Sequence, residues 1–219
     1  MSIFRRRLMM GQGETEILPA NSYVQEGLIF QLDGIEKGAD DGSWVDLVGG
    51  KILTGGATSM NKCFYFSDTY LTNSTYLPAN ADYTVEVIYV QTSTNSQGSV
   101  IFCSSDASNT NYICVVRKGS NMLFLNKKNT YTLSNAANNT PIYISANMTR
   151  ALYNGNVLSP NSSTDYWSGN KTTSIGRSLS SGVRYQFNGR VYSIRVYNRR
   201  LTEEEQRFNY AIDKKRFRL

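Results

Sequence analysis

A strand that leads directly into a helix stands near the end of the chain, where residues 187–205 read FNGRVYSIRVYNRRLTEEE. Apolar residues recur through Arg190–Tyr197, which predicts a strand. Thr202 occupies the position of a helix cap, and Glu205 three residues later completes a capping box. We therefore expect one helix over about residues 203–213. The residues expected on its buried face are Phe208, Ala211 and Ile212.

Upstream of that stretch, short apolar runs alternate with turns rich in Gly, Asn and Ser. In residues 83–90 the odd and the even positions form two distinct faces, which is the period of a β-strand. Asn154-Gly155 tolerates positive φ at both positions, so residues 151–158 are predicted to form a hairpin. The pattern predicts an all-β antiparallel sandwich, a jelly roll, with a short C-terminal helix. The other predicted strands are Leu28–Leu32, Lys62–Phe66, Ser99–Cys103, Tyr112–Val116, Met122–Leu125 and Pro141–Met148.

The strand-and-helix stretch resembles the closing signature of laminin-G-like domains, which are part of the concanavalin A-like lectin/glucanase superfamily. The matching pattern is Phe187-x-Gly189-x-Val191-x-x-Ile194-Arg195-Val196-Tyr197-Asn198-Arg199-x-Leu201-Thr202-x-x-Glu205. Four other segments are similar to motifs of this family and occur in its order. These segments are Gly27–Asp33, Trp44–Gly50 (with Val48 in place of the usual polar residue), Leu152–Gly155 and Ser174–Gly176. The resemblance covers about residues 25–213 and implies a jelly roll of two antiparallel sheets, with the first and last strands close together in one sheet.

The chain divides into three parts. Its 219 residues, 40% of them hydrophobic, are enough for one domain and few for two. Residues 1–22 lack apolar periodicity, and we expect them to form an arm that becomes ordered only on a partner. Residues 23–200 are predicted to form the sandwich, and residues 201–219 the C-terminal helix and a basic tail.

The net charge of +6 lies at the two ends of the chain. Residues 1–13 carry three basic and no acidic residues, and residues 190–219 carry nine basic and four acidic ones. One interpretation is solubility together with cations favoured at a helix C-terminus. The other is a basic docking surface for an acidic partner, because the resemblance brings both ends of the chain to one end of the sandwich. The residues of this predicted surface are Arg5, Arg6, Arg7, Lys214, Lys215, Arg216 and Arg218. Nucleic acid is disfavoured as the partner because no groove-reading helix or RNA-recognition motif accompanies the charge.

The chain contains no histidine, which excludes Ser-His-Asp and Cys-His catalysis and every His-ligated metal site. Glycosidases of the superfamily use paired carboxylates on a strand with the pattern E-x-D-x-x-E, and this chain has no such match. Glu86 is expected to be an exposed sheet residue. We therefore predict that the protein is not an enzyme and needs no cofactor.

The residue types suggest two kinds of ligand site, one for a sugar and one for calcium. Sugar binding would use aromatic rings, and the candidates are Tyr166 and Trp167 in a polar loop and, second, Trp44; packing in the core or at an interface is the alternative for all three. Calcium takes oxygen ligands, and Asp40, Asp41 and Asp46 cluster with Asp33 nearby. No EF-hand spacing is present, and we favour a solvated acidic turn.

The cysteines and the apolar runs indicate in which cellular compartment the protein is expected. Cys63, Cys103 and Cys114 lack metal spacing, and we favour buried free thiols over a Cys103–Cys114 disulfide. No apolar run approaches the roughly 20 residues of a membrane-spanning helix. The basic start of the sequence is not followed by the apolar stretch of a signal peptide, so none is predicted.

These observations support two hypotheses. The first is a non-enzymatic structural and adhesion protein: a lectin-like jelly roll docked by its basic ends on capsid or fibre subunits of a bacteriophage virion, as a capsid decoration or head fibre. Such a protein would be assembled in the host cytoplasm and could bind host-surface or gut glycans. Its first ten residues are similar to the starts of structural proteins in phages of gut Bacteroidetes. The second is a free carbohydrate-binding lectin or the binding module of a bacterial glycan-degrading system.

Overall fold

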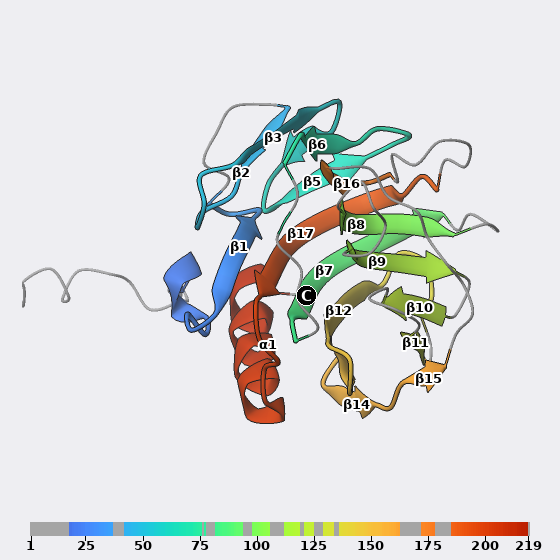
Figure 1. Ribbon diagram of the computed structural model, residues 1–219. Helices are drawn as coiled ribbons and strands as arrows, with labels where there is room; N and C mark the ends of the chain where they lie inside the picture. The colour runs from blue at the N-terminus through green and yellow to red at the C-terminus, as the bar shows by residue number, and fades with distance from the viewer. Residues whose placement is uncertain are drawn as a thin grey trace, which may run out of the picture.

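Two antiparallel β-sheets face each other in the computed structural model, and one helix lies outside them (Figure 1). The structure describes residues 18–36, 42–75, 77, 82–93, 98–105, 112–118, 121–124, 129–133, 136–162, 172–177 and 185–218. The predicted all-β sandwich with one C-terminal helix is confirmed. No helix in the described ranges is long and apolar enough to cross a membrane.

Sheet A carries the longest strands, and its order is β14-β13-β12-β7-β17-β5-β4, with β1 paired to β17. In chain order its strands are β1 (Leu28–Asp33), β4 (Thr58–Met60), β5 (Cys63–Phe66), β7 (Thr84–Ser93), β12 (Pro141–Ala146), β13 (Ala151–Tyr153), β14 (Asn156–Leu158) and β17 (Asn188–Tyr197). The pairing of β1 with β17 confirms that the first and last strands of the sandwich are neighbours.

Sheet B has the order β15-β11-β10-β9-β8-β16-β6-β3-β2. Its strands are β2 (Ser43–Val45), β3 (Ile52–Gly55), β6 (Leu71–Asn73), β8 (Ser99–Ser105), β9 (Tyr112–Lys118), β10 (Asn121–Phe124), β11 (Asn129–Thr132), β15 (Asn161–Ser162) and β16 (Thr172–Ile175). The remaining elements are a short 3-10 helix, η2 (Ala20–Ser22), and the helix α1 (Glu203–Phe217).

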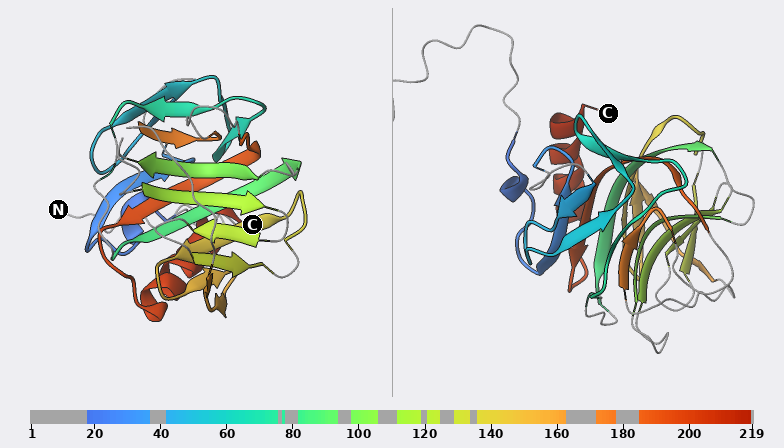
Figure 2. Two further views of the ribbon diagram at one scale, coloured as in Figure 1. Left: turned by 45° about the vertical axis from the view of Figure 1, so that its right-hand side comes forward. Right: turned by 90° about the horizontal axis from the view of Figure 1, so that it is seen from above.

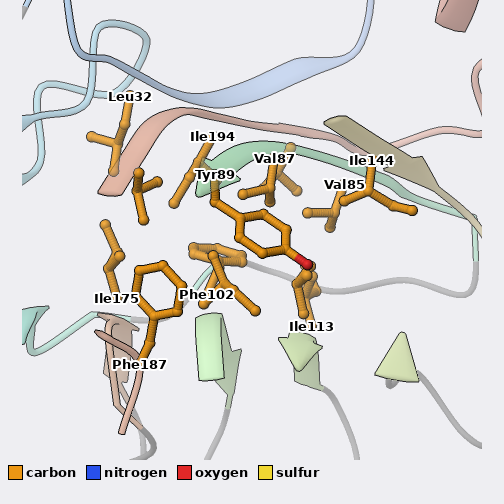
Figure 3. Close-up of a cluster of buried hydrophobic side chains, with 14 of the residues drawn as sticks. Leu32, Val85, Val87, Tyr89, Phe102, Ile113, Ile144, Ile175, Phe187 and Ile194 are labelled. Atoms are coloured by element: carbon orange, nitrogen blue, oxygen red, sulfur yellow. The ribbon is translucent and has the colours of Figure 1, made fainter. Parts of the chain in front are cut away.

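The hydrophobic core fills the space between the two sheets (Figure 3). Val85, Val87 and Tyr89 of β7 point inward, as the alternation in residues 83–90 predicted. They meet Phe102 of β8 and Ile113 of β9 across the sandwich. Burial of these apolar side chains is the main force that holds the sheets together.

The predicted hairpin is present between β13 and β14. Its turn residues Asn154 and Gly155 have φ angles of 46° and 87°, both in the left-handed region that a type I′ turn requires. A local sequence signal therefore suffices to place this turn.

Helix α1 begins with the predicted capping box: the Thr202 hydroxyl accepts from the Glu205 backbone N–H, and the Glu205 carboxylate accepts from the Thr202 N–H. The predicted buried face is confirmed for Ile212 and wrong for the other two residues, because Phe208 is 53% exposed and Ala211 is also exposed. The residues that α1 buries are mostly polar: Gln206, Asn209, Ile212, Asp213, Arg216 and Phe217.

The outer face of sheet A is covered by α1, which lies on the side of the sheet away from sheet B (Figure 2, right). Glu86 of β7 points to this face and is fully buried, so its predicted exposure is also wrong. The alternation in β7 indicated two faces correctly, but the second face meets the helix instead of water.

The last residues of the predicted arm, 18–22, pack on the sandwich. Ala20 is buried in η2, its N–H donates to the Glu36 carboxylate, and its carbonyl accepts from the Gln31 amide. Residues 1–17, which include Arg5, Arg6 and Arg7, lie outside the described residues.

Cys103 of β8 and Cys114 of β9 are partners in the strand register and form a disulfide. The prediction of free thiols is wrong for this pair. Their Cα atoms are 4.1 Å apart, because directly opposite residues on antiparallel strands approach closely. Cys63 is buried on β5 and is not part of this bond.

The disulfide predicts a thiol count. Protein denatured without reductant should react with one equivalent of a thiol reagent, from Cys63, and reduced protein should react with three. Cys63→Ser should lower both counts by one. Three reactive thiols without reductant would show that Cys103 and Cys114 are not paired.

Gly189 predicts a large loss of stability on substitution. Its φ is +154°, and a Cβ atom there would lie 2.1 Å from the backbone oxygen of Val90. Gly50→Ala is a matched control, because Gly50 also has a positive φ, +66°, but has nothing within 4 Å of an added Cβ. In urea unfolding, Gly50→Ala should cost about 1–2 kcal/mol from backbone strain, and Gly189→Ala clearly more. Equal losses would mean that the close approach to β7 does not matter.

Candidate functional site

A buried arginine joins helix α1 to sheet A. Arg195 of β17 is fully buried. Its Nε donates to the Glu86 carboxylate of β7 at 2.7 Å, and its two terminal nitrogens donate to both oxygens of Asp213 on α1. The planar guanidinium supplies donors in a fork that suits two carboxylates at once. The helix is therefore fixed to the sheet by one cation between two anions.

Further polar contacts complete this junction. Asn209 of α1 donates to Glu86 at 2.9 Å, and Tyr143 of β12 donates to the other Glu86 oxygen at 2.9 Å. The Gln206 amide donates to the hydroxyl of Ser145, also on β12, at 2.9 Å. Buried polar groups must find such partners because desolvation without them is costly. Glu86 thus has a structural role, with both its oxygens bound.

Tyr23 closes the junction from the N-terminal side. Its hydroxyl donates to Asp213 at 2.6 Å, and its ring centroid lies 3.8 Å from the guanidinium carbon of Arg195. Burial, together with the negative charge of Asp213, raises the pKa of Tyr23 well above its usual range. Tyr23 therefore stays protonated and acts as a hydrogen-bond donor.

Arg216 is not part of an exposed basic surface, contrary to prediction. It is fully buried, and its NH2 group donates to Asp33 at 2.8 Å and to Glu36 at 3.4 Å. Of the predicted docking cations on α1, Lys214 and Lys215 are exposed, and Arg218 directly after the helix is exposed as well.

A cleft of about 240 Å³ opens between α1 and the outer face of sheet A, beside the buried junction. Its lining residues are Ile88, Pro141, Tyr143, Asn154, Tyr210, Asp213 and Lys214. The rings of Tyr143 and Tyr210 meet at 4.7 Å between centroids with a tilt of 37°. The Lys214 ammonium lies 5.6 Å from the Tyr210 ring centroid. The cleft thus combines an aromatic wall with polar groups, the usual composition of a small-molecule site.

Asp213 borders both the junction and the cleft. Burial raises the pKa of its carboxyl to about 6, although the positive charge and hydrogen bonds of Arg195 act in the opposite direction. Because its oxygens are bound by Arg195 and Tyr23, the carboxylate is held as part of the junction.

The structure tests the predicted sugar-binding role of Trp44 but not that of Tyr166 and Trp167. Trp44 is fully buried, stacks on Phe64 at 4.6 Å and donates from its indole N–H to the Asp33 carbonyl. It offers no face to a sugar, and the alternative of core packing is confirmed. Tyr166 and Trp167 lie outside the described residues and stay a prediction.

Asp46, proposed as a metal ligand, caps a turn. Its carboxylate accepts from the backbone N–H groups of Gln31, Val48 and Gly49 at 2.9–3.1 Å. Asp40 and Asp41 lie outside the described residues. Among the residues that the structure does describe, no group of three or more acidic or cysteine side chains could hold a metal ion.

The sequence did not single out Tyr143, Asn154 and Tyr210 as site residues. Tyr143 and Tyr210 belong to regular elements that meet only in the folded protein, and Asn154 was interpreted as a turn residue. One signal was present: polar residues recur at positions 206, 209 and 213 of the predicted helix, on one helical face. That face indicates packing against charged side chains.

No protein-family model and no curated protein matches the chain. Solved structures do match. A Trypanosoma rangeli sialidase in complex with sialic acid superposes with a TM-score of 0.61 and 14% identity, over 91% of this chain and 35% of the sialidase. The receptor-binding domain of botulinum neurotoxin mosaic serotype C/D gives a TM-score of 0.53 and 14% identity, over 84% of this chain and 50% of that domain.

A third similar structure has nearly the same extent as this chain. Domain 4 of AbnA, a GH43 extracellular arabinanase from Geobacillus stearothermophilus, in complex with arabinotriose, gives a TM-score of 0.56 and 12% identity. The match covers 84% of this chain and 98% of that domain, whereas the chain spans only about a third of the sialidase. These similarities confirm the concanavalin A-like fold that the sequence resemblance implied.

The junction predicts a pH-dependent defect in Arg195→Met. Removal of the cation leaves Glu86 and Asp213 buried without it, which should cost about 3–5 kcal/mol at pH 7–8. Without Arg195 the pKa of Asp213 should rise further. Between pH 8 and 5 the Asp213 carboxyl of the folded variant then binds a proton, whereas in the unfolded chain, with a pKa near 3.8, it stays ionised. The free energy of unfolding of the variant should therefore increase, relative to wild type, as pH falls from 8 to 5.

Urea unfolding at several pH values measures this effect. Arg207→Met is the control, because Arg207 forms an exposed pair with Glu203 that should contribute at most about 1 kcal/mol at any pH. A pH-independent loss for Arg195→Met would contradict the role given to Asp213.

Proposed function

We propose that the protein is a non-catalytic carbohydrate-binding module, with a sugar site in the cleft between α1 and sheet A. The observation that carries this proposal is the pair of tyrosine rings, Tyr143 and Tyr210, in the wall of an open cleft on a concanavalin A-like fold. Fold alone does not define function, so the argument rests on the groups in the cleft.

The cleft groups suit a sugar ring. The apolar face of a sugar can pack on the half-exposed ring of Tyr210, while its hydroxyls need donors and acceptors at the rim. Asn154 accepts from the Tyr143 N–H at 2.8 Å, and its amide nitrogen, 3.4 Å from the Pro141 carbonyl, has a second hydrogen for a ligand hydroxyl. The volume of about 240 Å³ is below the roughly 300–1,000 Å³ of drug-sized pockets, which favours one sugar ring.

The similar structures support the same class of ligand. The arabinanase domain was solved with arabinotriose and the sialidase with sialic acid. The arabinanase domain also has nearly the extent of this chain, within a larger sugar-cleaving enzyme. The Cys103–Cys114 disulfide adds support, because disulfides persist in oxidising compartments, where such modules meet their glycans.

Binding without cleavage is supported by the state of the acidic groups. Hydrolysis by the usual glycosidase route needs two carboxyl groups that reach the scissile bond. Glu86 and Asp213 are each held by Arg195 and further donors in the junction. The absence of histidine removes the other common proton-transfer group.

The virion hypothesis has less support. The burial of Arg216 removes one cation from the predicted docking surface. None of the three similar structures named above is a virion protein. Lys214, Lys215 and Arg218 are exposed, but they do not single out a capsid or fibre subunit as the partner.

The proposal predicts that Tyr210→Ala weakens sugar binding. A glycan array should first identify a bound sugar, and calorimetry should then show about a five- to tenfold loss of affinity in the variant, the usual contribution of an aromatic contact. Phe208→Ala is the matched control, because Phe208 is an exposed ring on the same helix that does not line the cleft.

Trp167→Ala tests the loop candidate in the same assay. If this variant loses binding and Tyr210→Ala does not, the sugar site is in the loop and the cleft is not the site. If a broad array gives no binding at all, the proposed function fails.

A further inference from the structure

We infer that the cleft selects sugars that carry a carboxylate, such as uronic or sialic acids, and that the Lys214 ammonium is the group that recognises the charge. This inference rests on the proposed function and specifies its ligand class. The observations behind it are the exposure of Lys214 and its position over the ring of Tyr210 in the cleft.

The cleft is lined by one acidic and one basic side chain, and only the basic one is exposed to a ligand. Asp213 is 3% exposed and is bound by two nitrogens of Arg195 and by the Tyr23 hydroxyl. Lys214 is exposed, and the contact recorded for its ammonium is with the ring of Tyr210. The charge offered to a ligand is therefore positive.

Three acidic residues around α1 are paired with arginines, and the exposed Glu204 lies in the first turn, about 15 Å along the helix from Lys214. Glu36 contacts Arg216, Glu203 contacts Arg207 and Glu205 contacts Arg199. Near the cleft, the exposed charges of the last helical turns are those of Lys214 and Lys215. An anionic ligand in the cleft would thus meet the exposed ammonium of Lys214.

Geometry places Lys214 where a sugar carboxylate would lie. Tyr210 and Lys214 are four residues apart, so their side chains lie on the same face of the helix. The ammonium stands 5.6 Å from the ring centroid, beside the surface on which a sugar would pack. A carboxylate on the rim of a stacked sugar ring could then meet the ammonium, while neutral sugars would present only a hydroxyl there.

A second cation, Arg190 of β17, lies on the same face of sheet A outside the cleft, where its side chain is hydrogen-bonded to Tyr192. Arg190 of β17 is opposite Val90 of β7, and Val90 is opposite Pro141 of β12, which lines the cleft. Directly opposite residues point to the same face, so Arg190 is on the cleft side of the sheet about 10 Å from Pro141, two strand spacings away.

Matched sugar pairs test the inference. D-galacturonic acid is compared with D-galactose, and D-glucuronic acid with D-glucose, because each pair differs only at C6; N-acetylneuraminic acid is a further acidic probe. Binding is followed by NMR titration of the labelled full chain. We expect at least about fivefold tighter binding of the acidic partner at low salt, with the difference shrinking as salt screens the exposed charge.

Lys214→Gln should weaken binding of the acidic sugar at least about fivefold and so abolish the preference for it. Lys215→Gln is the matched control: it removes the same charge from the same helical turn, but Lys215 does not line the cleft. A urea-unfolding midpoint equal to that of wild type shows that the Lys214 variant is folded. Sodium acetate is titrated as a probe for a carboxylate alone, and we expect it to bind far more weakly than the uronic acids.

Four results would overturn the inference. Equal affinity for acidic and neutral partners would reject charge selection and leave the proposed sugar binding intact. A preference that persists in Lys214→Gln, or disappears equally in Lys215→Gln, would reject the assignment to Lys214. Acetate binding as tight as that of the uronic acids would show a general anion site. Absence of binding by every sugar would reject the proposed function itself, and the inference with it.

Discussion

The attachment of helix α1 to the outer face of sheet A depends on one buried cation. Arg195 stands between Glu86 on the sheet and Asp213 on the helix, and its hydrogen bonds have direction as well as strength. Directional hydrogen bonds from one guanidinium to two carboxylates define the position of the helix on the sheet. Because the helix is fixed in that way, the rings of Tyr143 and Tyr210 meet and a cleft remains beside them.

Local patterns were sufficient for most of the fold. The alternation in β7, the Asn154-Gly155 turn and the capping box at Thr202 are each encoded within a few residues, and all are present. The rules failed where an element meets a partner distant in sequence. The helix was expected to bury an apolar face, but its partner is a charged sheet face, so Asn209 and Asp213 are buried and Phe208 is exposed.

The candidate site was harder to predict for the same reason. Residue type alone does not show whether an aromatic ring is exposed. Trp44 is a sugar-binding candidate by residue type, but Phe64 and the Asp33 carbonyl enclose it in the core. The cleft residues come from β7, β12, the β13–β14 turn and α1, which no sequence motif joins. Arg216 looked like one of several surface cations until Asp33, 183 residues away, proved to be its partner.

Glu36 contacts both ends of the described chain: its carboxylate accepts from the Ala20 N–H near one end and from Arg216 near the other. A mechanical load applied between these two ends would therefore pass first through the contacts of Tyr23 and α1. The strands of the sandwich lie outside that line of force. Under tension the N-terminal segment and the helix would detach before any sheet opened, so a module tethered from both sides could yield and extend while its two sheets stayed folded.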